Sequence, residues 1–177
     1  MERIFLIGYM GVGKTTLGKG LAKALNLEFV DLDLYIQARY QKTVTQLFEE
    51  YGEDGFRKIE NKLLKEVSDF ENVVISTGGG APCFYDNIDI MNRKGKTVYL
   101  KASTDLLHSR LLTCRDKRPL LQNKTDEELY NFIKENLRKR EPFYSKAKYT
   151  LEAEELVSRD DIEKYVSLLS ELLNIKH

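Results

Sequence analysis

Short apolar runs alternate with longer amphipathic stretches along most of the chain. Five runs have the length and composition of strands, at residues 4–7, 28–31, 72–76, 97–100 and 149–151. The stretches between them repeat apolar residues at helical spacing, as Leu17, Leu21 and Leu25 do. Strands that alternate with helices predict an α/β fold, in which a parallel sheet is covered by helices on both faces. The last strand is expected at an edge of this sheet.

The clearest helical pattern covers residues 53–70. Its apolar face predicts a buried stripe, which consists of Phe56, Ile59, Leu63, Val67 and Phe70. Arg57 lies off this stripe. A capping box at residues 43–46 opens a shorter helix, which Gly52 is expected to stop. Other helices are expected at residues 16–25, 34–40, 86–94, 104–112, 125–144 and 160–173.

Residues 8–15, GYMGVGKT, match the phosphate-binding loop G-x-x-x-x-G-K-[ST]. The loop lies between a predicted strand and a predicted helix, which is the context that the motif needs. Its glycines allow backbone N–H groups to turn inward around a phosphate, and the helix N-terminus adds partial positive charge. Lys14 is expected to reach the β and γ phosphates of ATP, and the Thr15 hydroxyl is expected to ligate Mg²⁺. The nucleotide-binding residues expected from the motif are Gly11, Val12, Gly13, Lys14, Thr15 and Thr16.

Charge and length narrow the classes of function. The chain has 177 residues, which predicts a single domain, and its 28 basic residues balance 28 acidic ones. This balance gives no support for nucleic acid or an anionic membrane as a partner. Residues 93–148 carry 15 basic and 7 acidic residues, so this segment could fold over phosphates. A solvated helix face explains much of the same excess. We expect a monomer.

The cysteines and the N-terminus indicate the compartment. Cys83 and Cys114 show neither C-x-x-C spacing nor a neighbouring histidine cluster, so a zinc site is not expected. Two thiols without a disulfide framework fit a reducing environment. The apolar run at residues 4–7 is too short for a signal peptide or a membrane span. We therefore expect a cytoplasmic protein.

Two further groups of residues follow predicted strands. Asp31 and Asp33 follow the second strand, and residues 78–80, GGG, follow the third. Carboxyl ends of parallel strands meet at one edge of a sheet, where such folds bind ligands. Three consecutive glycines are costly to order unless a ligand must approach the backbone. The alternatives are two helix-capping aspartates and a tight turn into Pro82.

One motif is a decoy for a different class of enzyme. Residues 123–126, NKTD, match the N-K-x-D of guanine-specific GTPases. Here the match follows a charged loop and opens a helix, whereas in GTPases it ends a buried strand. The chain also contains no D-x-x-G, the motif that contacts the γ-phosphate of GTP. A GTPase is therefore not expected.

The motifs form an ordered set along the chain: GYMGVGKT at 8–15, DLD at 31–33, GFRKIE at 55–60, GGG at 78–80, RPLL at 118–121 and REPFY at 140–144. Together they resemble the shikimate kinases, which have the nucleoside-monophosphate-kinase-like P-loop fold. The resemblance covers essentially the whole chain. It implies a three-layer α/β/α P-loop fold with a central, mostly parallel five-stranded sheet. It also implies a small substrate-binding helical region at about residues 33–60 and a mobile lid at about residues 113–124.

The resemblance implies an acceptor site for shikimate, a small trihydroxy carboxylate. It gives Asp33 the contact with the reacting hydroxyl, and Arg57 and Arg140 the contacts with the carboxylate. Gly79, the middle glycine of its triplet, matches a backbone contact with the substrate. The chemistry agrees, because a guanidinium group binds a planar carboxylate through two parallel hydrogen bonds. The R-x-P-x-Y match selects Arg140 among the three consecutive basic residues at 138–140.

The nucleotide side follows from the same resemblance. Arg118 matches the lid arginine that reaches the ATP phosphates, so Lys14, Asp33 and Arg118 are the implied catalytic residues. Thr15 would ligate Mg²⁺, which Asp31 would meet through water. Lid closure would expel water and prevent wasteful ATP hydrolysis. In several members of the family an arginine before the last helix stacks on adenine, but here residues 151–156 contain none, so no residue is assigned to adenine.

The implied reaction is the ATP-dependent phosphorylation of the 3-hydroxyl of shikimate, a step toward chorismate and the aromatic amino acids. The implied cofactors are ATP and Mg²⁺. Gluconate kinases and nucleoside monophosphate kinases share the phosphate loop, but the short substrate region and the triple glycine favour shikimate. A nucleotide-binding module without catalysis is the third reading. The joint presence of Lys14, Thr15, Asp33, Arg57 and Arg118 argues against it.

Overall fold

The fold is a five-stranded sheet between layers of helices, seen in a computed structural model that describes residues 1–156 and 158–175. The strands are β1 (Arg3–Ile7), β2 (Glu28–Asp31), β3 (Val73–Ser76), β4 (Lys96–Lys101) and β5 (Tyr149–Glu152), in the spatial order β2-β3-β1-β4-β5. Every pair of neighbouring strands is parallel. The predicted fold class is therefore confirmed, although the sheet is entirely rather than mostly parallel. β5 lies at an edge, as expected.

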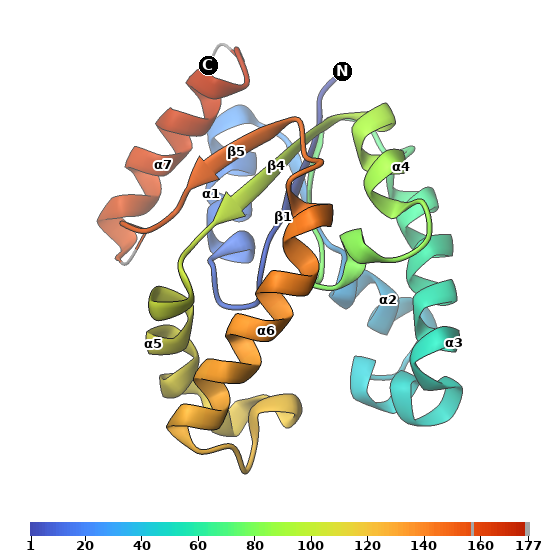
Figure 1. The fold of residues 1–177 in the computed structure, drawn as a ribbon. Helices are drawn as coiled ribbons and strands as arrows, with labels where there is room; N and C mark the ends of the chain where they lie inside the picture. The colour runs from blue at the N-terminus through green and yellow to red at the C-terminus, as the bar shows by residue number, and fades with distance from the viewer. Residues whose placement is uncertain (157, 176–177) are drawn as a thin grey trace.

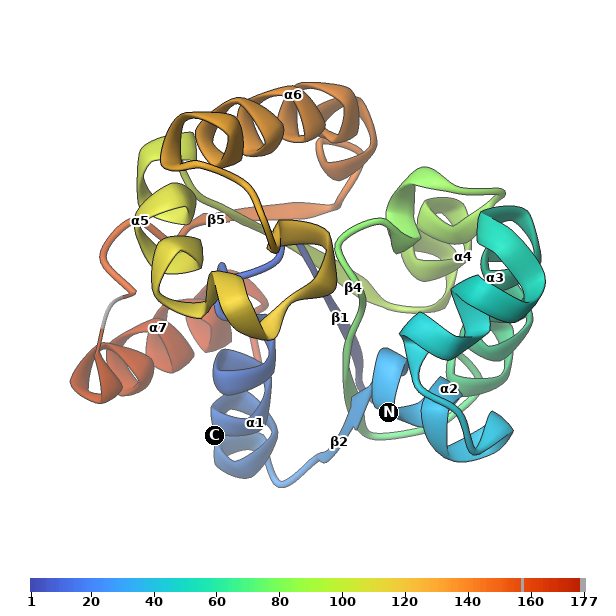
Figure 2. The same cartoon turned by 90° about the horizontal axis from the view of Figure 1, so that it is seen from below.

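Helices cover both faces of this sheet, which confirms the predicted three layers (Figures 1 and 2). The helices are α1 (Lys14–Leu25), α2 (Leu32–Tyr40), α3 (Val44–Val67), α4 (Asn87–Lys94), α5 (Thr104–Cys114), α6 (Asp126–Tyr144) and α7 (Arg159–Leu172). α1 and α7 pack together on one face, and α3 and α4 lie on the other, together with the C-terminal end of α6 (Figure 2). Within the described residues, no helix is both long and apolar enough to cross a membrane.

The continuous apolar character of β1 follows from burial on both sides. Ile4 and Leu6 contribute to the core beneath α1 and α7, whereas Phe5 and Ile7 contribute to the core beneath α2, α3 and α4. All four side chains are fully buried. Side chains alternate between the two faces of a strand, so a strand covered on both faces needs apolar residues at every position. The alternation divides the interior into two cores.

The predicted helix at 53–70 is the second part of a longer helix. α3 begins at the expected capping box, in which Thr43 and Gln46 hydrogen-bond to each other's backbone. Gly52 adopts the non-helical angles φ 71° and ψ 178°, so the helical backbone is interrupted there as expected, and α3 consists of two helical segments joined at a kink. The predicted burial of Phe70 is wrong, because α3 ends at Val67 and leaves Phe70 37% exposed.

The segment predicted as a lid has more local structure than its polar sequence suggests. α5 continues to Cys114, which is two residues beyond the expected end of that helix. Two short 3-10 turns follow, η2 (Arg115–Lys117) and η3 (Pro119–Leu121). Leu121 is fully buried and anchors the end of the segment in the core beside α5 and α6.

The end of the sheet far from the carboxyl ends of the strands offers a test of the fold alone. At Gly95, which joins α4 to β4, a Cβ atom would lie 2.4 Å from the Arg3 carbonyl oxygen. Gly95→Ala is therefore expected to lower the free energy of unfolding by about 1–3 kcal/mol, since backbone atoms of β1 cannot move aside cheaply. Urea unfolding measures this loss, and the exposed neighbour Arg93→Ala is the control that should change little. Equal stability of the two variants would contradict the packing described here.

Candidate active site

Two cavities adjoin at the carboxyl ends of the strands. One, of about 540 Å³, is lined by the phosphate loop, Asp31 and Asp33. The other, of about 480 Å³, is lined by α3, the glycine triplet, the lid segment and Arg140. Asp33, Gly79 and Arg118 line both cavities. We call these the phosphate cavity and the acceptor cavity.

The phosphate loop has the backbone shape that its glycines predict. Gly8, Gly11 and Gly13 have φ angles of 148°, 84° and 108°, which favour glycine. Lys14 folds back over the loop, where its Nζ donates to the carbonyl oxygens of Gly8 at 2.7 Å and Tyr9 at 3.0 Å. Burial lowers the pKa of Lys14 to about 7, and nearby Asp33 opposes the shift. A phosphate in the cavity would offer this ammonium group a stronger partner.

Five of the six nucleotide-binding residues expected from the motif line the phosphate cavity: Gly11, Gly13, Lys14, Thr15 and Thr16. Val12 does not line it. Its side chain is fully buried in the core, and its N–H donates to the Tyr9 carbonyl oxygen at 3.3 Å. Val12 therefore stabilises the conformation of the loop through its buried side chain and this backbone hydrogen bond.

Thr15 and Asp31 place two oxygen-bearing side chains side by side at the phosphate cavity. The Thr15 hydroxyl donates to Asp31 Oδ2 at 3.3 Å, while Asp31 Oδ1 accepts from the Leu34 N–H at 3.1 Å and caps α2. Asp31 can therefore cap α2 with one carboxylate oxygen while the other oxygen faces the phosphate cavity. Oxygen ligands suit Mg²⁺, which keeps several waters and is commonly bound with substrate phosphates. The described residues contain no group of three or more acidic, histidine or cysteine ligands, so phosphate and water would complete this site.

Asp33 lies in the wall shared by the two cavities, at the start of α2. Burial raises the pKa of its carboxyl group, and Asp31 adds to the shift. Lys14 and Arg57 oppose it from the two sides. A carboxylate with a raised pKa between a phosphate site and a second cavity is placed to accept a proton or hydrogen bond from an acceptor hydroxyl.

Arg57 is held by a carboxylate and by aromatic rings. Its Nη1 donates to Glu60 Oε1 at 2.9 Å, and its guanidinium carbon lies 4.2 Å from the Phe84 ring centroid. Glu60 is 1% exposed, and burial raises its pKa to about 7, with Arg57 opposing the shift. A pair with Glu60, three residues further along the same helix, is also what the sequence suggests for a surface arginine without a role in the site, but here the Arg57 side chain is only 11% exposed and that of Glu60 is buried.

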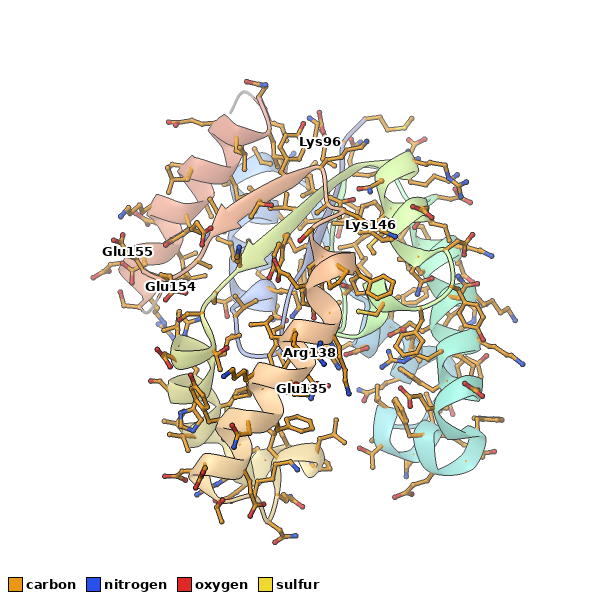
Figure 3. All side chains as sticks on the ribbon, in the orientation of Figure 1. Lys96, Glu135, Arg138, Lys146, Glu154 and Glu155 are labelled. Carbon is orange, nitrogen blue, oxygen red and sulfur yellow. The ribbon has the colours of Figure 1, made fainter. Side chains whose placement is uncertain are left out.

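The structure separates Arg140 from its basic neighbours. Arg138 pairs with Glu135 on the surface of α6, where the two side chains lie close together (Figure 3). Lys139 is exposed. Arg140 lines the acceptor cavity, and its guanidinium carbon lies 5.3 Å from the centroid of the Tyr9 ring. Among the three consecutive bases, Arg140 is thus the one that reaches the site.

Each glycine of the triplet makes room for a different charged side chain. A Cβ atom on Gly78 would lie 3.1 Å from both carboxylate oxygens of Asp33. On Gly79 it would lie 3.0 Å from Arg140 Nη1, and on Gly80 it would lie 2.5 Å from Arg57 Nη2. The triplet therefore allows one carboxylate and two guanidinium groups to contact a single stretch of backbone.

Both arginines retain hydrogen-bonding capacity. Among the described residues, no hydrogen-bond partner is present for the buried Nε of Arg57 or the buried Nη1 of Arg140, although Glu53 Oε1 lies 3.9 Å from the Arg57 Nε. Unsatisfied buried donors are rare and costly in folded proteins. Two such donors at one cavity fit a site that binds an anion.

The lid segment lies over the junction of the cavities. Arg118 stands between η2 and η3, and Lys117, Pro119 and Leu120 line the acceptor cavity beside it. Arg115 ties the segment to its far end by donating to the Lys124 carbonyl oxygen at 3.1 Å. The basic residues of this segment thus divide between the junction of the cavities, where Arg118 and Lys117 lie, and the far end, where Arg115 lies.

Arg110 makes contacts with the phosphate loop that were not predicted from the sequence. Its Nη1 donates to the carbonyl oxygens of Gly11 at 3.2 Å and Val12 at 3.0 Å, and its Nη2 donates to that of Leu156. The side chain therefore links α5, the phosphate loop and the segment after β5. No local pattern marks it, because its partners are 46 to 99 residues away.

A phosphate loop at the carboxyl ends of a parallel sheet, beside a second cavity that holds an aspartate and several arginines, is typical of P-loop kinases. The comparisons with known proteins make the class specific. A family model described as shikimate kinase matches residues 10–170. The chain belongs to the shikimate kinase family.

Individual shikimate kinases are similar to this chain in sequence and structure over nearly its whole length. The shikimate kinase of Bacteroides thetaiotaomicron is 57% identical over 99% of this chain and 100% of its own length. Its crystal structure superposes with a TM-score of 0.95, covering 98% of this chain and 99% of that one. The Acinetobacter baumannii shikimate kinase, solved in complex with shikimate, is 36% identical with a TM-score of 0.82 and covers 97% and 94% of the two chains.

The buried groups predict opposite pH dependences of stability. Folding raises the pKa of Glu60 from 4.5 to about 7, so between these values only the folded protein holds the proton and the free energy of unfolding falls as pH rises. Folding lowers the pKa of Lys14 from 10.5 to about 7, so above about pH 7 only the unfolded protein holds the proton and the free energy of unfolding rises with pH. Each effect is at most about 1.4 kcal/mol per pH unit.

Urea unfolding of the nucleotide-free protein at a series of pH values measures these slopes. Glu60→Gln is expected to flatten the acid side of the profile, and Lys14→Met is expected to flatten the alkaline side. Profiles that run parallel to the wild-type profile in both variants would contradict the assigned pKa shifts.

Proposed function

We propose that the protein transfers the γ-phosphoryl group of ATP to the 3-hydroxyl of shikimate and releases ADP and shikimate 3-phosphate. Membership of the family makes the chain a kinase of the shikimate pathway, which supplies the aromatic amino acids. The observation that carries the finer proposal is the junction of the two cavities. A carboxylate and an arginine stand at the junction, and two further arginines line the acceptor side.

Asp33 is the residue proposed to handle the reacting hydroxyl. Phosphoryl transfer to an alcohol depends mainly on alignment and on neutralisation of charge. Asp33 faces both cavities, so a hydroxyl in the acceptor cavity can reach its carboxylate and a phosphate at the same time. Its raised pKa brings the group closer to the range in which a general base works well.

Arg57 and Arg140 are proposed to bind the carboxylate of shikimate, together with the backbone N–H of Gly79. Each arginine has a buried nitrogen without a hydrogen-bond partner among the described residues, and each lies against the glycine triplet. The A. baumannii relative was solved with shikimate, which supports the choice of acceptor. Glu60 and the aromatic rings would hold Arg57 in place while it binds.

Lys14, the phosphate loop and Arg118 are proposed to bind the phosphates of ATP. Thr15 would hold Mg²⁺, with Asp31 meeting the ion through water, and the ion would neutralise charge on the phosphates. Lys14 would leave the carbonyl oxygens of Gly8 and Tyr9 when ATP binds. Arg118 would reach the transferred phosphate from the lid segment at about residues 113–124, which we propose to be mobile.

The organisation of the molecule is proposed on the same basis. A single domain spans residues 1–177, with the acceptor region at about residues 33–60. The protein acts as a cytoplasmic monomer. Neither nucleic acid nor a membrane is among its proposed partners.

An ADP-release assay tests the proposed reaction directly. ATP and Mg²⁺ are supplied with shikimate, with gluconate, with AMP or with no acceptor. We expect rapid release of ADP only in the reaction that contains shikimate as the acceptor. Faster release with gluconate or AMP, or equal release without any acceptor, would contradict the proposal.

The two arginines allow a sharper prediction. Arg57→Lys is expected to weaken shikimate binding by about 1–3 kcal/mol although the charge is kept, because an ammonium group cannot make the two parallel bonds of a guanidinium group. ATP affinity should barely change. Combining Arg57→Lys with Arg140→Lys should cost less than the sum of the single losses, since both residues bind one small anion. Titration calorimetry with each ligand measures these losses, and full additivity would show that the two arginines do not share a carboxylate.

A further inference from the structure

Tyr144 makes a contact to which no function has been assigned. It is the last residue of α6 and is fully buried. Its hydroxyl donates to the carbonyl oxygen of Gly79 at 2.5 Å, across a sequence separation of 65 residues. The contact therefore joins the end of α6 to the middle of the glycine triplet.

The backbone around this contact is held at every carbonyl group. Gly78 oxygen accepts from Ala81 N–H at 3.2 Å, and Gly80 oxygen accepts from Cys83 N–H at 3.0 Å. Both of these bonds close within the turn itself. The Gly79 carbonyl is different, because its partner is a side chain from another element. Glycine has no side-chain packing to fix its backbone angles, so such an outside contact decides how the peptide is oriented.

The carbonyl group of Gly79 and the N–H of Gly80 belong to one planar peptide unit and point in opposite directions. Fixing the Gly79 oxygen therefore also fixes the direction of the Gly80 N–H. Among the described residues, neither the Gly79 nor the Gly80 N–H has a hydrogen-bond partner. Both glycines line the acceptor cavity, between Arg140 and Arg57. Two free N–H groups between two guanidinium groups form a cradle for an anion.

We propose that Tyr144 is a positioning residue for the acceptor's carboxylate, which it orients by holding the peptide between Gly79 and Gly80. The inference rests on the proposed function, because it concerns the carboxylate that this function requires. Arg140 lies one helical turn before Tyr144 on α6. One helix thus supplies an arginine for the carboxylate and a hydroxyl that sets the direction of the Gly80 N–H.

The hydroxyl, and not the ring, carries this role. The ring packs against Tyr99, with centroids 5.0 Å apart, and a phenylalanine ring would fill the same space. Burial raises the pKa of the Tyr144 hydroxyl, with the Arg140 guanidinium opposing the shift, so the group remains a donor throughout the working range of pH. Removing the hydroxyl leaves the Gly79 carbonyl without this partner and frees the peptide to rotate.

Tyr144→Phe is the variant that tests the proposal, and Tyr99→Phe is its matched control. Tyr99 is equally buried in the same ring cluster, but its hydroxyl donates to Glu141 Oε2 at 2.6 Å and does not contact the triplet. Tyr144→Phe is expected to raise KM for shikimate about 5–10-fold, the effect of one hydrogen bond. KM for ATP and kcat should stay within about twofold, because the phosphate cavity is not touched. Tyr99→Phe should leave all three constants within about twofold of wild type. This should hold even if the melting temperature of Tyr99→Phe falls as far as that of Tyr144→Phe.

A neutral analogue separates positioning of the carboxylate from general loosening of the fold. The methyl ester of shikimate has the same ring and hydroxyl groups but no negative charge. Tyr144→Phe should weaken inhibition by the ester by less than about threefold, since a bond to a charged group loses more than one to a neutral group. Equal losses for shikimate and its ester, or equal KM effects in the two tyrosine variants, would overturn the proposal. Wild-type protein that released no ADP with shikimate would instead contradict the proposed function.

Discussion

The structure depends on the approach of three charged side chains to one short stretch of backbone. Asp33, Arg140 and Arg57 come from three different helices, yet each would contact a Cβ atom on a different glycine of the triplet after β3. The parallel sheet makes this possible, because β2 and β3 are neighbours and their carboxyl ends deliver the aspartate and the triplet to the same edge. The junction of the two cavities lies where these groups meet.

Charge balance explains why so many ionisable groups can be buried here. Asp33 is flanked by Lys14 on the phosphate side and by Arg57 on the acceptor side, and the pKa of Lys14 is lowered while that of Asp33 is raised. Glu60 neutralises Arg57, whereas the Arg140 guanidinium lies over the Tyr9 ring and forms no ion pair with a carboxylate within the described part of the chain. The acceptor side thus keeps positive charge for an anionic ligand, which agrees with a family that acts on a carboxylate.

The sequence predicted well those features that a local pattern encodes. The phosphate loop, the alternation of strands and helices along the chain and the capping box at Thr43 all follow from spacing within a few residues. The site residues from six segments could be named together only through the resemblance to a family. Phe70 shows the limit of periodicity, because a helical pattern does not say where the helix ends.

The features that the sequence did not predict are those set by distant contacts. Tyr144 bonds Gly79 across 65 residues, and Arg110 bonds Gly11 across 99. The burial of Glu60 was not predicted because a carboxylate within an amphipathic helix is usually solvated, and only packing against Arg57 and the acceptor cavity buries it. In each case the chemistry depends on the assembled fold.

The affinity of a Gly80→Ala variant for shikimate tests most directly whether the triplet exists to make room for the charged groups. A Cβ atom at this position would lie 2.5 Å from Arg57 Nη2, so Arg57 must move. We predict at least about a tenfold loss of shikimate affinity by calorimetry, with ATP affinity within about twofold of wild type, because a misplaced guanidinium group loses its charged hydrogen bonds. Unchanged shikimate affinity in a folded Gly80→Ala protein would contradict this account.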